Sequence, residues 1–179
     1  ESTIVDISGS EPVVLRPGAL PLEVLRSILP NLTVHERREF EMPAAPGQLM
    51  SHYAPQKPLV LLTHGALTSM HEISTIAKKL DDIASENKTI LQKPSLHKTA
   101  LTFSISRTRE VSNTGFFETV IDLSPQGSDI EAAVRLFTLL HELETSPCTS
   151  IWVEPLPPSG LGLAINDRLY KASYIKPEQ

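Results

Sequence analysis

Residues 45–55, APGQLMSHYAP, hold the densest run of side chains that could bind a ligand. Four of them carry hydrogen-bonding side chains, and the last is an aromatic residue: Gln48, Ser51, His52 and Tyr53. A plain spacer would carry glycine, serine and charge instead. Prolines and a glycine surround this run and disfavour a helix or central strand: Pro46, Gly47, Pro55 and Pro58. The pattern predicts an extended strap lying on another surface, or else an ordered linker with a packed tyrosine.

Other reactive residues lack the spacing that their chemistry requires. The pairs His71-Glu72 and His141-Glu142 have no second histidine four residues further on, so the histidines predict no metal site. Neither a G-x-S-x-G elbow nor a Walker A loop occurs. The single cysteine, Cys148, is interpreted as a small buried hydrophobic residue. We therefore expect no catalytic nucleophile and no metal ligand in this chain.

Two further patterns favour structural interpretations. Gly160-Leu161-Gly162 lacks the third glycine of a dinucleotide fingerprint, so we expect a tight turn between a strand and a helix. Arg107 and Arg109 lie in a polar stretch between predicted strands and are expected to be solvated loop residues.

The composition excludes several classes of protein. The chain has 179 residues, 40% of them hydrophobic, with a net charge of −5. No basic patch is evident that would bind nucleic acid. No apolar run approaches the roughly 20 residues that cross a bilayer, and the N-terminus lacks a secretory pattern. A lone cysteine fits a reducing compartment. These features predict a cytoplasmic protein with no direct nucleic-acid or membrane binding.

The elements that must position the strap differ on its two sides. Before it, strands are predicted at residues 3–7 and 12–15 and a helix at 21–29. Residues 31–44 are charged and aperiodic, which predicts a solvated segment.

After the strap, strands are predicted at residues 59–62, 89–91, 101–105, 117–123 and 150–154. Capping boxes begin helices at Ser69/Glu72 and Ser128/Glu131, and a last helix covers residues 163–172. The second helix is expected to bury Ala133, Val134, Phe137 and Leu140. Strands alternating with helices predict a three-layer, Rossmann-like α/β domain with a mostly parallel sheet.

Three stretches together resemble one known family: residues 2–6 with 15–18, the strap, and residues 154–169. In this order they resemble the two-domain form of threonylcarbamoyl-AMP synthase, in which a YrdC-type catalytic domain and a linker precede a Rossmann-like C-terminal domain. The resemblance implies a YrdC-type fragment at residues 1–30, a linker or lid at 31–56 and the accessory domain at 57–179.

The resemblance also implies an activity. The family uses L-threonine, bicarbonate and ATP with Mg2+ to make threonylcarbamoyl-AMP and pyrophosphate, and other proteins then modify tRNA. The missing catalytic region is expected in cis or in trans, so this chain alone should be inactive. A non-catalytic α/β module that binds a small ligand or a protein partner is the alternative interpretation, and a domain that only positions the strap is a third.

Site residues follow from the matched motifs. The resemblance implies that Ser2 binds L-threonine and that Arg16 and Tyr53 bind ATP, with His52 a weaker candidate. From the residues alone, Ser2 could be an ordinary strand-end hydroxyl, and Arg16 could pair with a surface carboxylate such as Glu11. The strap differs from one common family pattern at five positions and so leaves their contacts open: Ala45, Gln48, Leu49, Met50 and Ser51.

Overall fold

The computed structural model describes residues 2–34, 54–86 and 97–175. The chain divides into two compact units, Glu1–Ala54 with Leu156–Ala172, and Pro55–Pro155 with Ser173–Gln179. The second unit begins close to the predicted boundary at residue 57, but the last helix is grouped with the first unit. The division into residues 1–30, 31–56 and 57–179 stays a prediction.

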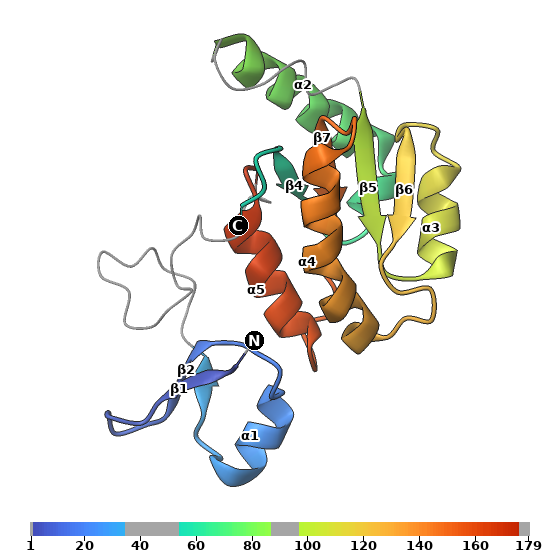
Figure 1. The fold of residues 1–179 in the computed structure, drawn as a ribbon. Helices are drawn as coiled ribbons and strands as arrows, with labels where there is room; N and C mark the ends of the chain where they lie inside the picture. The colour runs from blue at the N-terminus through green and yellow to red at the C-terminus, as the bar shows by residue number, and fades with distance from the viewer. Residues whose placement is uncertain (1, 35–53, 87–96, 176–179) are drawn as a thin grey trace. The chain divides into compact units, whose positions relative to one another are not determined.

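The first unit contains a small sheet at its N-terminal end (Figure 1, blue). It comprises β1 (Ile4–Asp6), β2 (Val13–Arg16), α1 (Leu22–Ile28) and β3 (Thr33–Val34). The strand order is β1-β2-β3, with β1 antiparallel and β3 parallel to β2. Three buried side chains form its core: Val14, Leu25 and Leu32. The predicted strands and helix are confirmed.

The short strand β3 corrects the prediction of a solvated segment at its first residues. The backbone N–H of Thr33 donates to the carbonyl of Pro12 at 3.1 Å, which pairs β3 with the start of β2. Two residues are too few to show a period in the sequence, so this strand depends on its partner.

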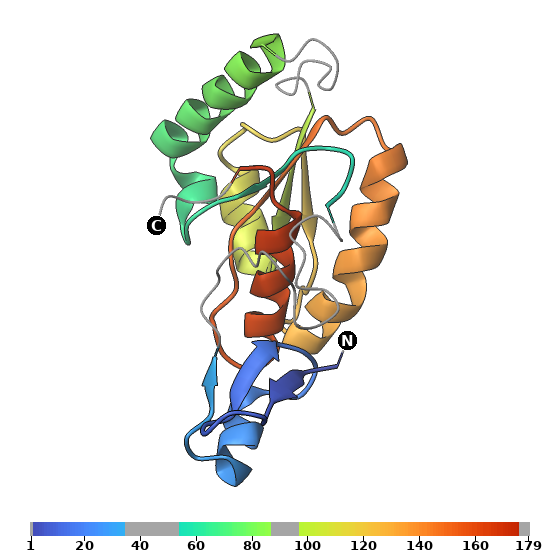
Figure 2. The ribbon, with the colours of Figure 1, turned by 90° about the vertical axis from the view of Figure 1, so that its left-hand side faces the viewer.

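The second unit is built on a four-stranded, all-parallel sheet in the order β4-β7-β5-β6. Its strands are β4 (Leu59–Leu61), β5 (Lys98–Thr102), β6 (Thr119–Asp122) and β7 (Ser150–Val153). The helical elements are η1 (Ala66–Thr68), α2 (Met70–Glu86), α3 (Ile105–Ser112) and α4 (Asp129–Thr145). Figure 2 shows the sheet between α4 on one side and α2 and α3 on the other. The predicted three-layer α/β class is confirmed.

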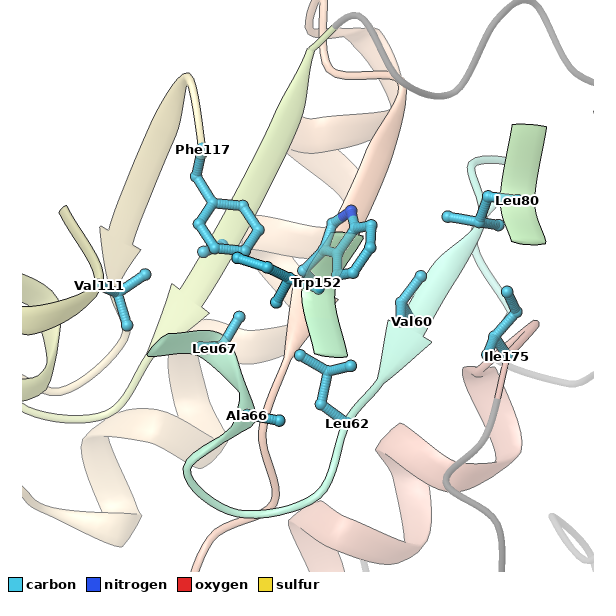
Figure 3. Packing of buried hydrophobic residues seen from close by; sticks show 11 residues of the cluster. Val60, Leu62, Ala66, Leu67, Leu80, Val111, Phe117, Trp152 and Ile175 are labelled. Atoms are coloured by element: carbon cyan, nitrogen blue, oxygen red, sulfur yellow. The ribbon is translucent and has the colours of Figure 1, made fainter. Parts of the chain in front are cut away.

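One face of this sheet packs on α2 and α3 around the fully buried Trp152 (Figure 3). Phe116 and Phe117 meet its ring edge-on, each with a centroid separation of 5.9 Å. The indole N–H donates to the Ser150 hydroxyl at 2.9 Å, so the buried ring leaves no unsatisfied donor. This cluster fixes β7 in the centre of the sheet.

Two predicted elements of the second unit are wrong. Residue 105 was predicted to end a strand, but it begins α3, because the Ser104 hydroxyl accepts the N–H of Arg107 as an N-cap. The predicted stripe on α4 is wrong for Val134 and Phe137, which are 70% and 40% exposed. The buried positions are Ala132, Leu136, Leu140 and Leu143. The strand predicted at residues 89–91 lies outside the described residues.

Candidate functional site

Ser2 and Arg16, the two described residues of the predicted site, lie in direct contact. Ser2 precedes β1 and Arg16 ends β2, and the antiparallel pairing of these strands brings the two positions together. The Arg16 guanidinium donates to the Ser2 carbonyl from Nε at 3.3 Å and from Nη2 at 3.0 Å. Nη2 also lies 3.1 Å from the Ser2 hydroxyl oxygen. Arg16 is only 8% exposed, so this arrangement is held within the unit.

The loop after β2 binds the same end of β1. A Cβ atom on Gly18 would overlap the backbone of Ser2 and Thr3, so only glycine fits this approach. The Thr3 hydroxyl donates to the carbonyl of Leu20 at 3.0 Å and accepts its N–H at 3.1 Å. These contacts fix the backbone on which Ser2 stands. Thr3 and Gly18 lie in the matched stretches 2–6 and 15–18, but nothing in the sequence predicted these contacts.

The remaining predicted site residues, Tyr53 and His52, lie outside the described residues, as does most of the strap. Their roles stay predictions.

A second polar cluster lies at the carboxyl ends of β4, β7 and β5. Glu154 directly follows β7, and its side chain is only 7% exposed. Its Oε1 accepts the backbone N–H of Leu67 at 2.5 Å, and its two oxygens receive Arg107 Nη2 at 2.5 Å and Nε at 3.2 Å. This bidentate contact with Arg107 provides hydrogen bonds and an opposite charge for a buried carboxylate that would otherwise destabilise the fold.

The cluster corrects the expectation that Arg107 is a solvated loop residue. Arg107 lies in α3 and its side chain is 22% exposed. Besides Glu154, it contacts Glu110 at 2.8 Å and the Thr68 hydroxyl at 3.4 Å. Burial works against its charge, but hydrogen bonds to Glu154 and Glu110 outweigh that effect and raise the pKa of Arg107 above its ordinary value. Arg109 is also helical, and it is exposed as expected.

The turn predicted at residues 160–162 is confirmed. Gly160 has a φ of 53°, and a Cβ atom on Gly162 would overlap the carbonyl oxygen of Pro157. The Gly162 N–H donates to the carbonyl of Ser159 at 2.9 Å, where α5 (Gly162–Ala172) begins. Asn166 then makes two hydrogen bonds of 2.8 Å with the backbone N–H and carbonyl of Leu156.

Cys148 is 6% exposed, as expected for a small buried hydrophobic residue. Among residues 2–34, 54–86 and 97–175, no three histidine, cysteine, aspartate or glutamate side chains gather in a way that could hold a metal ion. Within the same ranges, no helix has the length and apolar character to span a membrane.

These features define an α/β protein with an open, all-parallel sheet in its larger unit. The model of the family "Threonylcarbamoyl-AMP synthase, C-terminal domain" matches residues 20–173. The chain belongs to this family.

Relatives with known names cover almost the whole chain. Threonylcarbamoyl-AMP synthase of Pyrococcus abyssi is 25% identical over 177 residues, which are 97% of this chain and 45% of the relative. The Bacillus subtilis protein of the same name is 25% identical over 178 residues, with the same two coverages. The crystal structure of P. abyssi Sua5 complexed with L-threonine matches with a TM-score of 0.68 and 25% identity, over 100% of this chain and 48% of that one. The chain thus spans about half the length of the relatives it matches.

Proposed function

We propose that this chain is the C-terminal part of an L-threonylcarbamoyladenylate synthase. Joined to a YrdC-type catalytic region in cis or in trans, it would help convert L-threonine, bicarbonate and ATP into threonylcarbamoyl-AMP and pyrophosphate for tRNA modification. The family match over residues 20–173 carries the proposal. The contact between Ser2 and Arg16 supports it, because two residues expected at one site are brought together.

Each proposed site residue has a chemistry that suits its role. The Ser2 hydroxyl can hydrogen-bond L-threonine, and the Arg16 guanidinium can approach an oxyanion such as a phosphate of ATP. Tyr53 would contact ATP through its ring or hydroxyl, with His52 beside it. A strap that excludes water would protect the carbamate and the acyl-adenylate, both of which decompose in water.

Mg2+ is expected with ATP, but the described residues provide no group of carboxylates that fits it. No step of the proposal therefore depends on a metal held by this part of the chain.

A reconstitution experiment tests the proposal. The chain is produced together with a YrdC-type region, and formation of pyrophosphate from ATP is measured with L-threonine and bicarbonate. We expect activity that depends on all three substrates and that falls when Tyr53 is changed to alanine. If the complete protein makes no threonylcarbamoyl-AMP, the proposal is wrong.

A further inference from the structure

We propose that Arg16 is a positioning residue for Ser2, and that it makes the Ser2 hydroxyl a donor to the carboxylate of the amino-acid substrate. The inference rests on the proposed function and assigns Arg16 a second role beside its expected contact with ATP. It follows from which atoms of Ser2 the guanidinium contacts.

The first step is the geometry of the contact. Arg16 holds the Ser2 carbonyl with two N–H groups, at 3.3 and 3.0 Å, and this fixes the backbone of Ser2. The group Nη2 also reaches the Ser2 hydroxyl oxygen at 3.1 Å. Backbone and side chain of Ser2 are therefore held by one buried cation.

The second step is the direction of the hydroxyl proton. A serine hydroxyl has one donor and two acceptor sites, whereas a guanidinium can only donate. The Ser2 oxygen therefore accepts from Arg16 and must turn its own O–H elsewhere. A neighbouring positive charge makes that O–H a better donor and favours an anionic acceptor. For an amino-acid substrate the anionic acceptor is its carboxylate.

The third step is the rigidity of the support. Gly18 approaches the Ser2 backbone too closely for any side chain at position 18, and Thr3 is tied to Leu20 by two hydrogen bonds. Arg16 thus acts on a backbone that other contacts already hold in place. Lysine at position 16 would supply the charge but not the fork that holds the carbonyl and hydroxyl together.

A direct measurement on the 179-residue chain tests the geometry without any activity. The exchange of the Arg16 Nε–H with solvent is followed by NMR, with the exposed Arg26 as the control. We expect Arg16 to exchange at least about tenfold more slowly, since its N–H is buried and hydrogen-bonded. Equal exchange rates would overturn the inference whatever the function of the protein.

Kinetics of the complete protein, with the YrdC-type region present, test the role. Arg16→Lys and Arg16→Gln should raise KM for L-threonine about 10- to 100-fold, and Ser2→Ala should add little to either variant because both act through one hydroxyl. L-threoninamide, which lacks the carboxylate, should be only a weak competitive inhibitor of the wild-type protein. Its inhibition constant should differ less between the wild type and the variants than KM for L-threonine does. The control Arg26→Gln should leave KM for L-threonine and KM for ATP unchanged.

The outcomes separate the two proposals. If Arg16 variants raise KM for ATP alone while KM for L-threonine stays constant, the positioning role is wrong and the proposed function survives. If the complete protein has no activity with L-threonine, the proposed function fails, and the carboxylate assignment fails with it. Additive effects of Ser2→Ala and Arg16→Gln on KM for L-threonine would also overturn the positioning role.

Discussion

At the scale of the residue, the ion pair between Glu154 and Arg107 gives a sharp prediction about stability. Glu154→Gln should lower the free energy of unfolding by about 1 to 3 kcal/mol, because Arg107 and the Leu67 N–H lose a charged acceptor. Urea denaturation measures the difference. The matched control is Glu110→Gln, which changes a carboxylate that is 60% exposed on the same arginine and should cost no more than about 0.5 kcal/mol. Equal losses for both variants would contradict the account.

A second residue-scale prediction concerns the turn before α5. Gly162→Ala should destabilise the protein by about 1 to 3 kcal/mol, because the new Cβ would overlap the Pro157 carbonyl oxygen and the backbone must move. Gly9→Ala is the control, since its new Cβ would meet no atom nearer than the Glu11 carbonyl oxygen at 3.8 Å. Thermal unfolding of the two variants should show a lower Tm only for Gly162→Ala.

Individual residues also show what the sequence can predict about the candidate site. The matched motifs indicated Ser2 and Arg16 as residues of one site, but not that one holds the other. That contact depends on the register of β1 and β2, with Ile4 opposite Arg16, and register depends on both strands together. The close approach of Gly18 likewise becomes visible only when the strand beneath it is in place.

At the scale of the element, α4 provides a prediction from its corrected orientation. Leu136→Ala should cost about 2 to 5 kcal/mol, because it removes a side chain that is 1% exposed and leaves a cavity. Val134→Ala, two residues earlier and 70% exposed, should change stability by no more than about 0.5 kcal/mol. Chemical denaturation of both variants checks the orientation. A larger loss of stability for Val134→Ala would support the buried stripe predicted from the sequence instead.

The elements that were predicted well have local signals, and those predicted poorly do not. Ser69 and Ser128 each accept the N–H of the glutamate three residues on, so the serines of the two expected boxes cap α2 and α4. Ser104 caps α3 in the same way, but Arg107 stands where a box would have glutamate, so the sequence gives no capping-box signal for this helix. In α4, apolar residues occupy two adjacent stripes, and packing against the sheet decides between them.

At the scale of the whole molecule, the two sheets rest on hydrophobic clusters of different size. The small sheet β1-β2-β3 rests on a cluster of three buried hydrophobic residues, whereas the cluster around Trp152 has eleven. Short strands over a small core open more readily. Amide hydrogen exchange should therefore show β1 to β3 losing protection before β4, β5 and β7. Uniform protection across both sheets would contradict this prediction and indicate cooperative unfolding of the whole chain.

The place of Glu154 in the parallel sheet has a consequence for how the larger unit meets other molecules. In open α/β sheets, ligands bind in the crevice outside the carboxyl ends of the strands, where backbone N–H groups and cations receive their anionic groups. Here the chain supplies that anion itself, because the Glu154 carboxylate already accepts hydrogen bonds from the Leu67 N–H and from the Arg107 guanidinium. The Glu154 side chain thus occupies the donors that an external anion would use. A phosphate or carboxylate from solution would have to displace the Glu154 carboxylate before it could bind to them.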